Sequence, residues 1–139
     1  MQTGAYAGRL TGFDLEAEKQ TQDLVLALVR KHLVNAAHDL SDGGLAAAIV
    51  EMGAKRDLGL IADTTLTSTQ LFSETQGRFL LTVRPEDQAA FEAIAQDQAV
   101  QLGVVSTGDF DLKLADGEFH TQMSQLTTIY SEALACALK

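Results

Sequence analysis

The chain has 139 residues, 46% of them hydrophobic and 21% charged, a composition typical of one globular domain and not of a disordered segment. Ten basic and nineteen acidic side chains give a formal net charge of −9, with Lys and Arg scattered, which argues against nucleic acid and anionic membrane surfaces as partners. No apolar run approaches the roughly 20 residues of a transmembrane helix.

The two ends of the chain carry little chemistry. Residues 1–13 hold three glycines and no sustained periodicity, so we expect a lead-in or a linker remnant, followed by a single domain over residues 14–139. This segment lacks the basic and apolar regions of a signal peptide, which predicts a cytoplasmic protein. The lone Cys136 cannot form an internal disulfide and has no metal-ligand spacing around it.

The first half of the chain predicts helix, strand and helix. Asp14 is the expected N-cap of a helix over residues 14–32, whose segment 24–29 should be buried nearly all round. A short strand follows over residues 35–39. The second helix should begin at Ser41 and Asp42 and end near residues 55–56. Its apolar face has the i, i+3, i+4, i+7 spacing of an amphipathic helix: Leu45, Ala48, Ile49 and Met52.

The second half predicts further alternation. Residues 59–62 form a weak strand, residues 63–69 a loop, and residues 78–83 a strong strand buried on both faces. Pro85 should open a helix. Alternating apolar positions predict strands at 100–104 and 110–114, and Asp116-Gly117 predicts a hairpin turn. The last helix carries a stripe of Leu126, Ile129, Tyr130, Ala133 and Leu134. The expected fold is α/β or α+β, with a mixed sheet covered by helices.

Residues 38–45, with the sequence HDLSDGGL, lead from a strand end directly into a helix. Glycine lets backbone N–H groups approach another molecule, and a helix start suits a phosphate. Asp39 and Asp42 oppose that interpretation, because carboxylates repel phosphate unless Mg²⁺ lies between them. The alternative is structural: Ser41 or Asp42 caps the helix and the glycines permit a tight turn. His38 invites the role of general base, but a histidine at a strand end more often packs or caps.

Residues 72–78, with the sequence FSETQGR, form a polar segment that leads into an apolar strand. Polar groups at the mouth of a rigid strand are well placed to bind a ligand. The alternative is a turn whose charges are only solvated, and spacing alone does not decide between the two.

Three segments in chain order resemble the phosphoribosylformylglycinamidine synthase family. They are residues 14–18 (DLEAE), residues 38–45 (HDLSDGGL, followed by Glu51) and residues 71–79 (LFSETQGRF). The resemblance covers the chain from about residue 14 to its end. It implies the C-terminal domain of the second half of the synthetase part, with a fold like the C-terminal domain of aminoimidazole ribonucleotide synthetase.

The family makes purine precursors with ATP, Mg²⁺ and ammonia from glutamine. The resemblance implies that the catalytic histidine and the main ATP and Mg²⁺ residues lie upstream, so no catalytic or metal residue is assigned here and no cofactor is expected to be held by this domain alone. The implied partners are an upstream ATP-binding-type domain, the first half of the same enzyme and a glutaminase, and a domain cut from them could self-associate.

The resemblance also implies a phosphate or nucleotide site related by pseudosymmetry to the site of the first half. Thr75 departs from the serine usual in the family. An alternative is a purely structural packing module. Another is the same domain of a relative such as aminoimidazole ribonucleotide synthetase, selenide water dikinase or a hydrogenase maturation protein. The candidate site residues are Asp39, Ser41, Asp42, Gly43, Gly44, Glu74, Thr75, Gln76 and Arg78.

Overall fold

The computed structural model describes residues 14–137, and the expected linker at residues 1–13 lies outside this range. Five helices and six strands follow one another, with single turns of 3₁₀ helix at residues 54–56, 85–87 and 96–98. Their order is α1 (Leu15–Arg30), β1 (Ala36–Asp39), α2 (Gly44–Gly53), β2 (Leu58–Asp63), α3 (Ser68–Leu71), β3 (Phe79–Thr82), α4 (Gln88–Ala95), β4 (Val104–Thr107), β5 (Asp109–Leu114), β6 (Gly117–Gln122) and α5 (Met123–Ala137).

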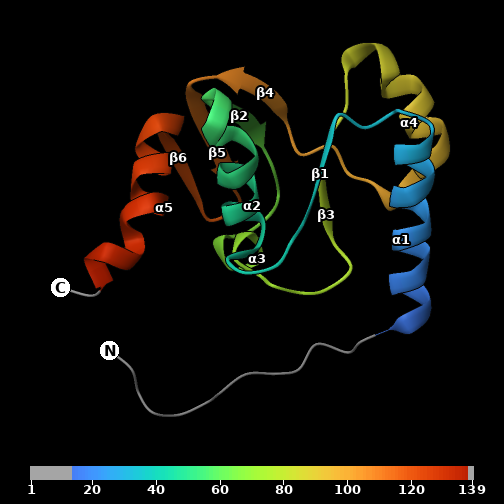
Figure 1. The fold of residues 1–139 in the computed structure, drawn as a ribbon, viewed down its shortest axis with the longest axis horizontal. Coiled ribbons are helices and arrows are strands. Elements are labelled where there is room, and N and C mark those ends of the chain that lie inside the picture. Colours follow the sequence, from blue (N-terminus) through green and yellow to red (C-terminus); the bar gives the residue numbers. More distant parts are fainter. Residues whose placement is uncertain (1–13, 138–139) are drawn as a thin grey trace.

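The larger sheet is mixed, as expected, and has the strand order β4-β2-β5-β6. Strands β2 and β5 are parallel, while the pairs β2–β4 and β5–β6 are antiparallel. Helix α2 covers one face of this sheet, with α5 beside it (Figure 1). The architecture is therefore α+β, with a helical layer on one side of a four-stranded sheet.

The core lies between α2 and this sheet, where sequence periodicity placed it. Phe110, Leu112 and Leu114 alternate along β5 and are all buried, while the intervening residues face outward. From α2, Leu45, Ala48 and Ile49 are buried against them. Because the apolar residues of β5 have period 2 and those of α2 have the helical period, each element presents one apolar face to the other.

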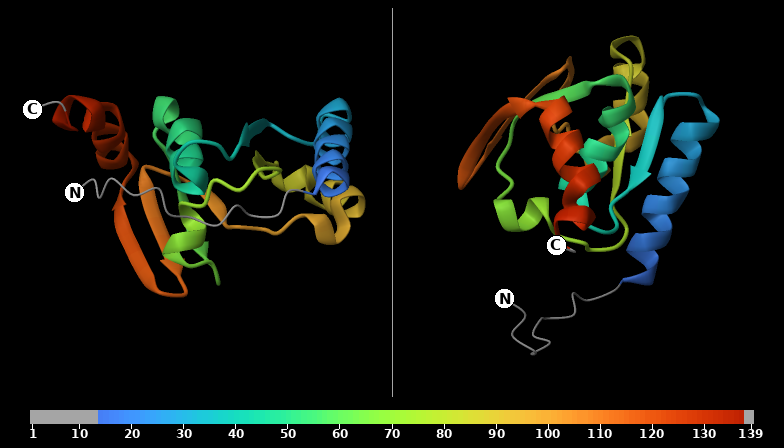
Figure 2. Two further views of the ribbon diagram at one scale, coloured as in Figure 1. Left: turned by 90° about the horizontal axis from the view of Figure 1, so that it is seen from below. Right: turned by 60° about the vertical axis from the view of Figure 1, so that its left-hand side comes forward.

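The smaller sheet contains only β1 and β3, paired antiparallel with His38 opposite Leu80. It lies between the larger sheet and the pair of helices α1 and α4 (Figures 1 and 2). The expectation that residues 78–83 are buried on both faces is wrong. Every residue of β3 is half-buried, because β3 has a single neighbouring strand.

Helix α1 begins where the sequence predicts, because the carboxylate of Asp14 accepts hydrogen bonds from the N–H groups of Glu16 and Ala17 at 3.0 and 3.1 Å. Burial of residues 24–29 on all sides is not observed. Leu28 is completely buried, whereas Leu26 and Val29 are each 45% exposed. Helix α1 packs mainly on α4, so only one of its faces is covered.

Two other expectations differ from the structure. The strand expected at residues 100–104 begins only at Val104, and Val100 is 91% exposed. The apolar stripe expected on α5 is not the face that is buried. Met123 is fully buried and Leu126 is half-buried, while Ile129 and Tyr130 of the expected stripe are exposed. No helix within residues 14–137 is long and apolar enough to span a membrane.

The predicted hairpin joins β5 to β6, with Leu114 opposite Gly117 and Leu112 opposite Phe119. Its turn is formed by Ala115 and Asp116, so Gly117 already belongs to β6. The Asp116 side chain also contacts Ser68.

Its Oδ1 accepts from the N–H of Ser68 at 2.8 Å, and its Oδ2 accepts from the Ser68 hydroxyl at 2.7 Å. The hairpin thereby fixes the first turn of α3, the short helix that precedes residues 72–78.

We predict that Asp116→Asn destabilises the chain near neutral pH and has less effect in acid. Hydrogen bonds from Ser68 hold the pKa of the Asp116 carboxyl below its usual 3.8. Such a group stabilises the fold above its unfolded-state pKa, and the contribution is lost as the pH falls through the folded-state value. Urea unfolding midpoints of the two proteins should therefore differ near neutral pH and converge below about pH 4.

Glu132→Gln, which removes a charge from an exposed position of α5, is the control and should show no such convergence. A midpoint difference between Asp116→Asn and wild type that is the same in acid and at neutral pH would contradict the prediction.

Candidate functional site

The candidate site begins with residues 39–44, here called the glycine turn, which connects β1 to α2. Leu40 anchors the turn, since its side chain is buried and its N–H donates to the Arg78 carbonyl at 2.9 Å. Gly43 has φ +79° and Gly44 has φ +61°, which is the left-handed region where glycine is favoured. The helix therefore begins at Gly44 and not at Ser41 or Asp42, and no side chain of the turn caps it.

Residues 72–78, here called the carboxylate loop, connect α3 to β3. Arg78 is half-buried and binds its own loop: its Nε donates to the Thr75 carbonyl at 3.2 Å, and its Nη2 donates to the Ser73 carbonyl. The Ser73 and Thr75 hydroxyls share a hydrogen bond of 2.9 Å. The guanidinium of Arg78, a candidate ligand-binding group, thus also closes its own loop.

The glycine turn and the carboxylate loop meet directly, although they are about 30 residues apart in the chain. The N–H of Gly43 donates to Oε1 of Glu74 at 2.9 Å. A Cβ at Gly44 would lie 2.7 Å from the Ser73 carbonyl oxygen and 2.9 Å from that of Leu71, so the two backbones touch where only glycine fits. This contact places the two candidate segments side by side.

A third segment reaches the same place. A Cβ at Gly77 would collide with the carboxylate of Glu18, which α1 presents to the carboxylate loop. Glu18 also accepts a hydrogen bond of 2.7 Å from Gln22 on its own helix. Residues 14–18, 38–45 and 71–79, which carried the sequence resemblance, therefore converge in the folded chain. Sequence reasoning did not place Glu18 in the site, because no pattern in α1 indicates that it contacts a distant loop.

The electrostatics of the site are negative. Asp39, Asp42 and Glu74 are exposed carboxylates, while the nearby guanidinium of Arg78 is bound to carbonyl groups. The Glu74 carboxylate lies at the N-terminal end of α2, where the helix dipole favours an anion. A carboxylate of the chain itself therefore occupies part of the position that a phosphate would take.

The other expected site residues lie on the same two segments. Ser41 is exposed, and its carbonyl accepts from the N–H of Gly44 at 2.9 Å. Gln76 is exposed and Thr75 is half-buried. Within residues 14–137 no group of three His, Cys, Asp or Glu side chains is placed to hold a metal ion.

A polar cluster that the sequence did not reveal adjoins the glycine turn. His38 Nε2 lies 2.8 Å from Oε2 of Glu51, and Oε1 of Glu51 accepts from the Tyr130 hydroxyl. His38 Nδ1 lies 2.6 Å from the Asp39 carbonyl oxygen. With both ring nitrogens occupied, His38 is not available as a general base in this arrangement. Tyr130 was predicted on an apolar stripe, and its partner Glu51 is 79 residues away in the chain.

The hydrogen bond to Glu51 is the largest cause that raises the pKa of Tyr130, followed by burial and by the negative charges of Glu51 and Asp42. Helix α5 lies beside the site because it packs on α2, the helix that follows the glycine turn. The phenol stays protonated and continues to donate at physiological pH.

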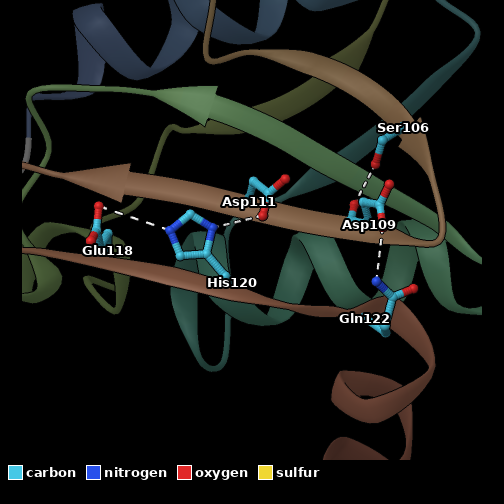
Figure 3. A network of polar contacts seen from close by, with 6 residues as sticks. All are labelled: Ser106, Asp109, Asp111, Glu118, His120 and Gln122. Carbon is cyan, nitrogen blue, oxygen red and sulfur yellow. Dashed lines mark hydrogen bonds and ion pairs between the residues drawn. The ribbon is translucent and has the colours of Figure 1, made fainter.

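A second polar network lies on the outer face of the larger sheet (Figure 3). His120 Nδ1 is 2.8 Å from Asp111, and Gln122 donates to Asp109 at 2.8 Å. The hydrogen bond to Asp111 is the first cause that raises the pKa of His120. These side chains are cross-strand neighbours on β5 and β6, on the face opposite the buried residues of β5. They stabilise the strand pair.

The fold and the candidate site together agree with the protein family that the sequence matches. The chain belongs to the family of the AIR synthase related protein, C-terminal domain, whose model matches residues 9–114. It is 49% identical over 136 residues to phosphoribosylformylglycinamidine synthase subunit PurL of Lacticaseibacillus paracasei, a match that covers 98% of this chain and 18% of that protein. The same subunit of Limosilactobacillus fermentum is 41% identical over 140 residues, which is 100% of this chain and 19% of that protein. The chain thus spans about a fifth of the length of these relatives.

Solved structures show the same fold. PurLQS from Thermotoga maritima matches with a TM-score of 0.71 at 23% identity, over 85% of this chain and 23% of that chain. T. maritima PurL complexed with FGAR matches with a TM-score of 0.70 at 22% identity, over 83% of this chain and 21% of that chain. The sequence left α/β and α+β as the two possible fold classes, and the structure confirms α+β.

We predict that Gly44→Ala destabilises the fold by about 1–3 kcal/mol, because the new Cβ meets two carbonyl oxygens and the backbone is strained at positive φ. Gly117→Ala is the matched control, since nothing lies within 4 Å of a Cβ there. Thermal and urea unfolding of both variants measure the difference. Equal stability of the two variants would show that the close approach of the turn and the loop is not tight.

Proposed function

We propose that this chain serves as one domain of an ATP- and glutamine-dependent phosphoribosylformylglycinamidine synthase of purine biosynthesis and does not catalyse alone. The family match, the identity to PurL subunits and the small share of their length that the chain covers support this assignment. In that reaction ATP phosphorylates the formamide oxygen of the substrate and ammonia displaces the phosphate. ATP and Mg²⁺ then belong to the whole enzyme.

The contact between Gly43 and Glu74 carries the proposal, because it joins the two polar segments into one surface. We assign that surface to the wall of a cleft closed by a neighbouring domain, where it faces a phosphate or nucleotide. Its exposed residues Asp39, Ser41, Asp42 and Gln76 offer hydroxyl, amide and carboxylate groups. The negative charge favours contact with N–H and O–H groups of the ligand over direct contact with bare phosphate.

The remaining parts of the proposal follow from the domain assignment. The partners would be an upstream ATP-binding-type domain, the first half of the same enzyme and a glutaminase, and the enzyme would act in the cytoplasm. Apolar side chains such as Leu15, Phe72 and Val100 are more than half exposed, which is consistent with surfaces that neighbours cover. The isolated domain could self-associate through them.

A second function, that of a packing module, is favoured by two observations. Glu74 accepts a hydrogen bond from Gly43 at the positive end of the α2 dipole, and Arg78 donates to a carbonyl group of its own loop. Both contacts stabilise the fold without any ligand. The two functions differ in what happens when only the charge of Glu74 is removed.

A chimaeric synthase tests the proposal, with this chain in place of the matching 136-residue segment of L. paracasei PurL. We expect the chimaera to convert substrate with ATP, Mg²⁺ and ammonia, and the 139-residue chain alone to form no product. Turnover by the isolated chain, or a folded chimaera without activity, would contradict the proposal.

Glu74→Gln in the same chimaera separates the two functions, because glutamine keeps the acceptor oxygen for Gly43 but loses the charge. A ligand-facing Glu74 predicts a rise in KM for ATP or substrate of roughly three- to tenfold at unchanged melting temperature. A purely structural Glu74 predicts a lower melting temperature with unchanged KM. Glu132→Gln on α5 serves as the control for loss of one carboxylate.

A further inference from the structure

The larger sheet ends at β4, whose outer edge is open (Figure 1). Within residues 14–137, β2 is the only strand that pairs with β4. The N–H of Gly108 donates to the Asp57 carbonyl at 2.8 Å, which continues the register of the β2–β4 pair by one residue. Hydrogen-bonded pairs alternate along an antiparallel ladder, so every second residue of β4 bonds to β2. These residues are Ser106 and Val104.

The two other residues of β4, Val105 and Thr107, therefore turn their N–H and C=O groups away from the sheet. These four backbone groups are here called the β4 edge. The faces of the strand are open as well. Val104 is 55% and Val105 is 57% exposed, although consecutive side chains of a strand lie on opposite faces. An uncovered apolar edge of this kind is a site at which another strand can pair.

The distribution of charge distinguishes this edge from the other one. Residues 99–108 contain no charged side chain, although charged residues make up 21% of the chain. The opposite edge strand, β6, carries His120 and Glu118, whose side chains are 67% and 66% exposed. Charged side chains on an edge strand oppose pairing with another chain. Of the two edges of the larger sheet, β4 is therefore the one suited to pairing.

We propose that β4 is a dimerisation strand, which pairs antiparallel with β4 of a second copy of this chain and joins the two larger sheets edge to edge. A two-fold axis at Ser106 places Val105 of each copy opposite Thr107 of the other. Each of these two pairs forms two backbone hydrogen bonds, so every group of the β4 edge is bonded on both copies. The inference goes beyond the proposed function, because it requires no ligand and no residue of the glycine turn or the carboxylate loop.

Charge and symmetry both favour a second copy as the occupant. Each copy has a net charge of −9, so two copies repel each other wherever acidic surfaces meet, and the uncharged β4 edge lets them approach. About the two-fold axis, the same edge supplies both sides of the contact and no complementary charges are needed. Salt should strengthen the dimer, because it screens the repulsion between the two acidic chains.

The size of the contact sets its strength. A stable interface buries about 1,600 Å² in total, and one strand of four residues falls well short of that area. We therefore expect a dissociation constant roughly between 10 μM and 1 mM.

Val105→Lys in the 139-residue chain tests the pairing, because it places a charge on the exposed edge strand. Sedimentation velocity from about 10 μM to 1 mM should show wild-type dimer that grows with protein and salt concentration, and a dissociation constant raised about tenfold or more in Val105→Lys. Val100→Lys is the matched control. It changes a valine that is 91% exposed and lies outside β4, so it should leave the dimer intact.

Val105→Pro and amide exchange test the backbone contact itself. Proline removes the N–H that faces the second copy and leaves the hydrogen bonds to β2, so the variant should keep the wild-type circular dichroism spectrum and lose the dimer. In wild type, the amides of Val105 and Thr107 should exchange more slowly as the protein concentration rises. Those of Val104 and Ser106 should be protected at every concentration, since they bond to β2.

Three outcomes would overturn the proposal. The first is a wild-type chain that stays monomeric over the whole concentration range. The second is a dimer that persists in folded Val105→Lys and Val105→Pro. The third is a dimer that Val100→Lys weakens as much as Val105→Lys does, which would indicate general apolar association and not strand pairing.

Discussion

The close approach of two backbones at Gly44 is the constraint on which the rest of the structure depends. Because the residue has no side chain, the start of α2 lies against the carbonyl groups of Leu71 and Ser73. That contact brings the Glu74 carboxylate to the N–H of Gly43, the residue just before the helix. It also sets the position of α2 over the larger sheet, since Leu45 and Ile49 follow within two turns. One geometric requirement therefore couples the core to the candidate site.

The same contact explains why the site is more acidic than an anion-binding turn would be. A helix N-terminus preceded by glycines suits phosphate, but here a carboxylate of the chain stabilises it. The guanidinium that could have offset the charge closes the carboxylate loop. The surface is thus rigid and pre-formed, and its exposed groups are mainly hydrogen-bond acceptors. These features agree with the proposed role of the surface as one wall of a cleft that a neighbouring domain closes.

Local patterns predicted the elements well where one face of an element is buried. The alternation in β5 and the spacing in α2 both identified core residues, because those elements pack on each other over their whole length. The same reasoning was wrong for α1 and β3, which have few neighbours. An apolar run such as residues 24–29 shows how much apolar surface a helix could bury. How much it does bury depends on how many helices and strands pack against it. Neither Ser41 nor Asp42 caps the helix as expected. Instead Glu74, which is distant in sequence, accepts a hydrogen bond from the N–H of Gly43 at the helix start.

The sequence by itself narrowed the fold class to α/β or α+β. It also determined the amphipathic faces of α2 and β5, the Asp14 cap and the three segments that mark the family. Each of these depends on residues within about two turns of one another, so the local order of side chains is sufficient. Only the tertiary structure shows that Glu18 contacts Gly77 and that Glu74, not a nearby side chain, accepts from Gly43 at the start of α2. The same holds for Glu51, which contacts both His38 and Tyr130. The Gly43–Glu74 and Glu51–Tyr130 contacts join residues 31 and 79 positions apart. A contact over such a separation is set by how the layers pack, which no local pattern encodes.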